Sequence, residues 1–96
     1  MPTLSIHLQD GFDDDEVAIL IDGEERARRS GVTTKRLYGL AETIELPASG
    51  RVTLEIRVRN LSKTLEPDVT RDVFVGVSLQ NGGIQTVVSV EPYGYA

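Results

Sequence analysis

The sequence predicts an all-β domain, an antiparallel two-sheet β-sandwich of seven or eight strands. Residues 51–59 alternate strictly between apolar and polar side chains, with Val52, Leu54, Ile56 and Val58 as the apolar set. A period of two places these four side chains on one face of an extended backbone. Similar segments recur roughly every 10 residues with turn-forming residues between them, which is typical of a sandwich. No segment has a convincing 3.6-residue apolar period over ten residues, as a helix would.

The length of the chain limits it to one domain, residues 1–96. A domain of this size removes roughly 60–70% of its unfolded surface from water, which is enough for one modest core. The chain has no cysteine. Neither a disulfide nor a cysteine nucleophile is therefore available, and packing alone must hold the core.

The first three strands are expected over residues 3–9, 16–22 and 24–29. The first two alternate or are rich in β-branched residues, as strands are. Asp22-Gly23 between the second and third predicts a tight hairpin, because both residues tolerate a positive φ. Residues 24–29 are almost entirely charged, so this strand is expected at an exposed edge.

The middle of the chain predicts a change of sheet. Residues 32–41 show no clear period. Leu37, Leu40 and Ala41 could form one helical turn, or residues 32–37 a short strand, and we expect an irregular crossover that links the two sheets. Residues 42–46 form a short strand that ends at Pro47, and residues 47–50 turn the chain back into the strand at 51–59.

Three further strands are expected over residues 63–70, 73–79 and 84–90. Pro67 lacks a backbone donor, so the first of these is expected at an edge or a bulge. Asn81-Gly82-Gly83 predicts the turn between the other two. The side chains of the last strand that are expected on one inward side are Ile84, Thr86, Val88 and Val90.

The charge balance argues against nucleic acid as a partner. The chain has 10 Lys and Arg against 15 Asp and Glu, a net charge of −5, which disfavours a phosphate backbone. It has neither a leader pattern after Met1 nor an apolar stretch near the roughly 18 residues of a membrane span. We therefore expect no membrane partner and a cytoplasmic location.

An acidic run near the N-terminus is a candidate calcium site. Ca²⁺ takes six to eight oxygen ligands from flexible loops. The run lacks the EF-hand spacing, and its alternative interpretation is a solvated loop. The candidate ligands are Asp10, Asp13, Asp14, Asp15 and Glu16.

Catalysis is not predicted. The one histidine, His7, occupies an outward strand position, where a surface histidine is expected. Ser5 or Ser89 would have to supply a nucleophile beside it, and nothing in the sequence marks an oxyanion loop. We expect no enzymatic activity.

Several strands are apolar on both faces, which indicates a contact surface. In a two-layer sandwich only the inner face of each sheet is covered, and a contiguous apolar outer face marks a contact with another chain. The alternative is that the crossover at 32–41 or the tail at 93–95 covers these residues. The predicted interface residues are Ala18, Leu20, Phe74, Gly76 and Val87.

Four segments together resemble small prealbumin-like and PEGA-type modules. They are Val17-Ala18-Ile19-Leu20-Ile21-Asp22-Gly23-Glu24, Val32-Thr33-Thr34, Ile44-Glu45-Leu46-Pro47 and Arg51-Val52-Thr53-Leu54-Glu55-Ile56. The resemblance spans about residues 17–58. It implies an immunoglobulin-like or prealbumin-like sandwich that serves as a non-catalytic binding module, and it transfers no active-site residues.

The sequence thus predicts a non-catalytic interaction module that mediates protein–protein contact or self-association as a homo-oligomer, without a cofactor. The alternative is a calcium-dependent, carbohydrate-binding-like module that uses the acidic run at 10–16.

Overall fold

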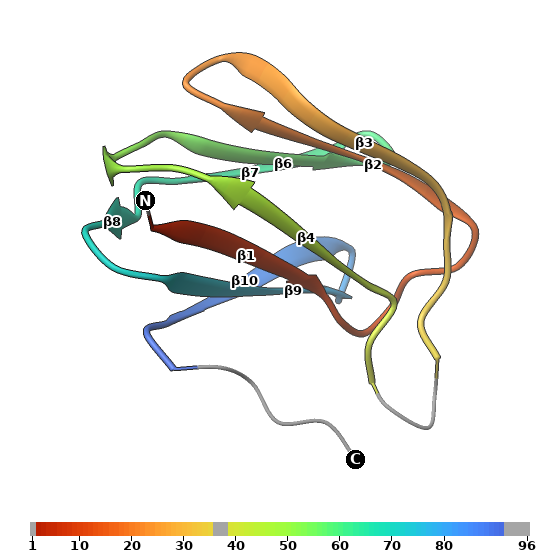
Figure 1. The fold of residues 1–96 in the computed structure, drawn as a ribbon. Coiled ribbons are helices and arrows are strands. Elements are labelled where there is room, and N and C mark those ends of the chain that lie inside the picture. The colour runs from red at the N-terminus through yellow and green to blue at the C-terminus, as the bar shows by residue number, and fades with distance from the viewer. Residues whose placement is uncertain (1, 36–38, 92–96) are drawn as a thin grey trace.

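The computed structural model describes residues 2–35 and 39–91 (Figure 1). This part of the chain is all β, as predicted, and it contains no helix that is long and apolar enough to cross a membrane. Its strands are β1 (Thr3–Leu8), β2 (Asp15–Ile21), β3 (Glu24–Val32), β4 (Glu42–Pro47), β5 (Gly50–Arg51), β6 (Leu54–Val58), β7 (Leu61–Leu65), β8 (Asp68–Val69), β9 (Val73–Gln80) and β10 (Gly83–Ser89).

The strands form two main sheets that pack face to face (Figure 1). Sheet A has the order β10-β9-β1-β4, and sheet B has the order β3-β2-β6-β7. On one side of the sandwich β3 lies beside β4, and on the other β7 lies beside β10. A two-stranded ladder of β5 and β8 lies at one end. The predicted two-sheet, all-β architecture is confirmed.

The prediction of purely antiparallel sheets is wrong for one pair of strands. Sheet B is antiparallel throughout, but in sheet A β1 runs parallel to β9. These strands are far apart in the sequence, and an alternating pattern is the same whichever way a neighbouring strand runs. Sheet A is therefore mixed.

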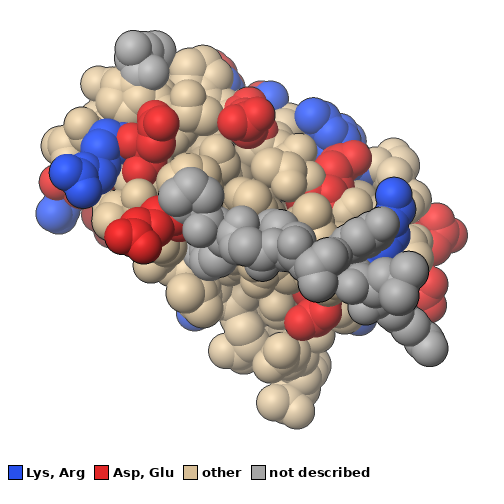
Figure 2. All heavy atoms as spheres, turned by 60° about the horizontal axis from the view of Figure 1, so that its bottom comes forward, with Lys and Arg blue, Asp and Glu red and all other residues tan. Residues whose placement is uncertain are grey.

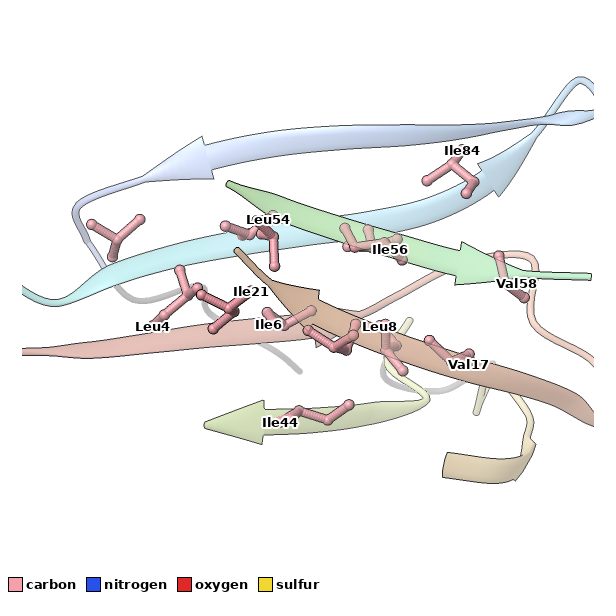
Figure 3. Packing of buried hydrophobic residues seen from close by; sticks show 14 of the residues in the cluster. Leu4, Ile6, Leu8, Val17, Ile21, Ile44, Leu54, Ile56, Val58 and Ile84 are labelled. Carbon is pink, nitrogen blue, oxygen red and sulfur yellow. The ribbon is translucent and has the colours of Figure 1, made fainter. Parts of the chain in front are cut away.

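The core fills the space between the sheets with aliphatic side chains from the inner face of each strand (Figure 3). Both sheets contribute fully buried residues, and each removes apolar surface from water. The side chains of this kind labelled in Figure 3 are Leu4, Ile6, Leu8, Val17, Ile21, Ile44, Leu54, Ile56, Val58 and Ile84.

The predicted strand at 51–59 is divided into two by its tertiary surroundings. Arg51 ends β5, and β6 begins at Leu54. At the break, the backbone of Thr53 bonds to Asp22: its N–H donates to Asp22 Oδ1 over 2.9 Å, and its carbonyl accepts the Asp22 N–H over 2.8 Å. Val52 donates its N–H to the carbonyl of Pro67. The predicted inward face is nonetheless confirmed, because all four apolar residues of this segment are buried.

Tight turns join the two strands of each hairpin. Asp22-Gly23 has positive φ at both positions, as predicted. Asn81-Gly82 forms the predicted turn and also has positive φ at both positions. A third turn follows β6, where Arg59 has a φ of 58°. The sequence placed the break between the two strands at residues 60–62, whereas the turn lies at Arg59 and Asn60. Its start was misplaced because arginine is not a turn-forming residue. As a result β7 begins at Leu61, earlier than the expected start at Lys63.

Two predictions for the connecting segments are confirmed in part. The described residues of the 32–41 segment link β3 of sheet B to β4 of sheet A, as expected. Pro67 lies between β7 and β8, so the predicted strand at 63–70 is two short strands. Residues 36–38 and the tail at 93–95, which the sequence offered as a cover for the outer faces, lie outside the described residues.

Candidate functional site

Strand β10 is the most apolar exposed element of the described chain. Its Val87 and Val88 are 62% and 51% exposed, and Val90, just after it, is 53% exposed. These are the exposed large hydrophobic residues in the part of the chain that the structure describes. Figure 2 brings the sheet A side of the molecule forward, and the lowest part of that view is uncharged.

Val88 and Val90 were predicted to point inward and be buried, and the structure contradicts their burial. In register Val88 lies opposite Val75, which is fully buried, so Val88 does lie on the core face of sheet A. It is exposed because β10 is the outermost strand, and an inner position on an edge strand is covered only where the opposite sheet extends over it. Ile84, near the start of the same strand, is covered in this way.

The five predicted interface residues do not form one surface. Ala18 and Leu20 lie on β2 of sheet B, whereas Phe74, Gly76 and Val87 lie on β9 and β10 of sheet A. Val87 is exposed, as expected, and Phe74 is half-buried. Ala18, Leu20 and Gly76 are buried, which contradicts the exposure expected for them.

Long charged neighbours account for the burial of Ala18 and Leu20. Cross-strand partners share a face, and register places Ala18 between Arg28 and Arg57 and Leu20 between Glu25 and Glu55. The aliphatic stems of such side chains cover apolar surface while their charged ends stay in water. On sheet A the side chain of Gln9 lies over Gly76, with its Oε1 2.8 Å from the position that a Cβ would occupy.

Ion pairs neutralise the outer face of sheet B. Arg28 Nη1 lies 2.9 Å from Glu16 Oε2, and Arg28 Nη2 lies 2.6 Å from Glu25 Oε1. Arg57 pairs with Glu55. The hydrogen bond from Arg28 lowers the pKa of Glu25, and the same bond raises the pKa of Arg28. Because these groups are exposed, water screens them and they add little net stability.

A shallow depression of about 330 Å³ lies beside these pairs. Three of its lining residues are arginines, which on their own would suit an anion. Each arginine already contacts a carboxylate of this chain, so an anionic ligand would have to displace one. The lining residues are Asp14, Asp15, Glu16, Ala18, Arg28, Arg57, Val58 and Arg59.

Asp15 has a structural partner. Its side chain is 7% exposed and accepts two hydrogen bonds from Arg59, 2.7 Å from Nε to Oδ1 and 3.0 Å from Nη2 to Oδ2. The backbone N–H of Asp13 adds a third, 2.9 Å from Oδ2. The Arg59 bond holds the pKa of Asp15 below its usual value, against the opposite effect of burial.

The other acids of the predicted calcium site do not converge on Asp15. Asp10, Asp13 and Asp14 are exposed, and Glu16 forms an ion pair with Arg28. Within residues 2–35 and 39–91, no three His, Cys, Asp or Glu side chains are placed to hold one ion. An ion that used Asp15 would also compete with Arg59. Calcium binding by the 10–16 run therefore stays a prediction without geometric support.

The acidic loop is anchored by a residue that the sequence interpretation missed. Phe12 is 3% exposed and packs into the core. Its N–H donates to Thr34 Oγ1 over 3.0 Å, and that hydroxyl donates to the carbonyl of Gln9 over 2.6 Å. Gly11 has a φ of 89° and lies so close to Leu79 that a Cβ would be 2.1 Å from its carbonyl oxygen. A lone aromatic within an acidic run was the available signal.

His7 is on the outer face of sheet A, as predicted, but it is buried. Its ring lies 6.1 Å from that of Phe74 at an angle of 57°. Burial lowers the pKa of His7, and the nearby charge of Glu45 opposes this shift. The hydroxyl of Ser89 is engaged in its own turn through two hydrogen bonds with the backbone of Glu91. In register, Phe74 lies between Ser5 and Ser89.

No protein-family model matches the chain, and no curated protein or solved structure shows significant similarity to it. The resemblance to prealbumin-like and PEGA-type modules stays a prediction.

Proposed function

We propose that this domain is a non-catalytic interaction module that contacts another protein chain through β10 and the residues beside it. The observation that carries this proposal is the concentration of exposed aliphatic surface on one edge strand, at Val87, Val88 and Val90. Exposed aliphatic residues that cluster, rather than lie scattered, mark contact surfaces. An immunoglobulin-like or prealbumin-like classification of the two four-stranded sheets would suit such a module.

A comparison of the edge strands supports the choice of β10. Edge strands present backbone N–H and C=O groups to any passing chain, and charges or prolines on them discourage pairing. Of the described edge strands, β3 has five charged residues, β4 has Glu42, Glu45 and Pro47, and β7 has Lys63. Strand β10 has seven residues, none of them charged and none a proline. It therefore lacks the features that protect the other edges.

The proposed module is non-catalytic because of the surroundings of the side chains that catalysis would need. His7 is buried on the sheet, and the Ser89 hydroxyl is bound within its own turn. The arginines beside the depression on sheet B are paired with carboxylates. None of these groups is arranged as a nucleophile with an activating base.

Site-specific photo-crosslinking tests this proposal. A photoreactive amino acid replaces Val88 in one variant and Glu24, an exposed residue of β3, in a control variant. Illumination in the cells that naturally express the protein should give a discrete crosslinked product from position 88 and none from position 24. If both positions give the same products, or neither gives one, β10 is not a contact surface and the proposal is wrong.

A further inference from the structure

We propose that the occupant of the β10 edge is a second copy of this chain. Two copies would pair β10 with β10 in antiparallel fashion about a two-fold axis perpendicular to the sheet, which joins their two sheets A into one continuous sheet. This inference rests on the proposed function and names its partner.

The first argument is the position of β10 in the sheet. It is the terminal strand of sheet A and pairs in register with β9 along its whole length, from Gly83 opposite Gln80 to Ser89 opposite Phe74. No described strand is hydrogen-bonded to its outer edge, although β7 of sheet B lies beside it. Its sequence, with Ile84, Val87 and Val88 among seven residues, has the β-branched composition of a sheet interior.

The second argument is the charge of the chain. Each copy has a net charge of −5, so two copies repel one another, and like charges that meet across a strand pair destabilise it. Electrostatic repulsion therefore opposes self-pairing least at an edge strand without charged residues. Of the described edge strands β10 alone meets this condition. A partner of opposite charge would instead be expected to select a charged edge.

The third argument is the match of side chains across the two-fold axis. Symmetry requires one residue to face its own copy, and pairing about the middle of β10 makes that residue Thr86. Ile84 of each copy then lies opposite Val88 of the other on the core face. Val88 already lies on that face, opposite the buried Val75, yet it is 51% exposed. An added strand would bring Ile84 of the other copy against Val88 and reduce its exposure.

The fourth argument is closure. A two-fold contact uses the same edge of each copy once, so the assembly stops at a dimer unless the other edge of sheet A also pairs. That edge is β4, which has Glu42, Glu45 and Pro47. The Oε2 of Glu42 is itself buried, without an aligned hydrogen bond, 3.1 Å from Arg29 Nε of sheet B. The charges and the proline of β4 discourage pairing at that edge, so the contact gives a closed dimer.

The mass of the protein in solution gives the first test. Sedimentation velocity and light scattering from micromolar to millimolar concentration should show a monomer–dimer equilibrium. Val88→Lys places a charge opposite the apolar Ile84 of the other copy and should weaken dimerisation at least tenfold. Thr43→Lys, an exposed position on the opposite edge of sheet A, should dimerise like the unmodified protein. Circular dichroism and melting curves confirm that both variants fold.

A cysteine scan gives a second test that does not depend on the Lys variant. Because the chain has no cysteine, single cysteines at Gln85, Thr86 and Val88 report which position meets its own copy. Under mild oxidation Thr86→Cys should form the interchain disulfide fastest. Thr43→Cys on β4, an exposed control at the opposite edge of sheet A, should stay reduced.

The outcomes separate this inference from the proposed function. A protein that stays monomeric at millimolar concentration, yet crosslinks from position 88 to a different protein, overturns the second-copy inference and leaves the proposed function standing. If the protein dimerises, but Val88→Lys does not weaken the dimer and no cysteine on β10 forms an interchain disulfide, the strand-pairing inference is wrong. A monomer without any crosslink from position 88 overturns both.

Discussion

Neighbouring acids with the same side chain have different surroundings in this protein. Asp13 and Asp14 are exposed, whereas Asp15 is buried and held by the Nε and Nη2 groups of Arg59. The pair fastens the acidic loop to the turn after β6, two segments 44 residues apart in the sequence. A bidentate, charge-assisted pair of this kind is stronger than an exposed ion pair.

Asp15→Asn and Asp14→Asn form a matched pair of substitutions. We expect Asp15→Asn to lower the free energy of unfolding by about 1–3 kcal/mol, toward the smaller value because Arg59 is half-exposed. Asp14→Asn should change it little, because asparagine tolerates the positive φ at that position. Urea unfolding at pH 7 measures both.

The pH dependence of the Asp15 effect has a defined sign. Arg59 lowers the folded-state pKa of Asp15, so the stabilisation is present above the unfolded pKa of about 3.9 and is lost as the pH falls below it. The difference between Asp15→Asn and the unmodified protein should therefore shrink near pH 3. An equal difference at pH 7 and pH 3 would contradict this account.

At the scale of elements, the hairpin of β2 and β3 does more than reverse the chain. Asp22 adopts the positive φ that the turn needs, and its carboxylate also accepts the N–H of Thr53 at the start of β6. The turn of one hairpin thus fixes where the next strand of sheet B begins.

Substitution of Asp22 separates its two roles. Asp22→Ala loses the acceptor and strains the backbone at φ 53°, and we expect the free energy of unfolding to fall by about 1–3 kcal/mol. Asp22→Asn keeps a side-chain oxygen and tolerates this φ, so it should lose less than about half as much. Thermal or urea unfolding of the two variants decides this, and equal losses would show that the negative charge itself is what matters.

Strand β10 shows the limit of an alternating pattern as a predictor. The alternation places Ile84 and Val88 on the same inner face, and the register confirms that face. Their exposure differs all the same, because coverage depends on how far sheet B extends over the edge of sheet A. A contact surface on β10 was therefore not predictable beyond Val87.

At the scale of the whole molecule, the histidine is buried although it lies on the outer face of sheet A. His7 is buried on sheet A, and its folded-state pKa is lowered below 6.5, first by burial, with Glu45 opposing. The folded protein thus favours neutral His7. This stabilisation is complete above about pH 6.5 and declines as the pH falls below it, because the unfolded chain takes up the proton first.

His7→Gln should remove this component of the pH dependence. We expect the unmodified protein to lose stability between pH 7.5 and 5, a range above that in which ordinary carboxyl groups titrate. The free energy of unfolding of the variant should change little over the same range. Urea unfolding at several pH values measures both profiles, and parallel profiles would show that another group is responsible.

The sequence by itself determined the strands, most of their inner faces and the Asp-Gly and Asn-Gly turns. These are local features, since alternation and turn chemistry depend on residues within a few positions of one another. The turn after β6 begins at Arg59, just before the break expected at 60–62, because the residue type of Arg59 gave no local signal.

Only the tertiary structure decided what lies opposite each strand. It made β1 parallel to β9, covered Leu20 with charged neighbours, paired Asp15 with Arg59 and left Val88 exposed at an edge. Each of these depends on segments that are distant in the sequence. An alternating pattern specifies which side of a strand is apolar, and the order and extent of the neighbouring strands decide whether that side is covered.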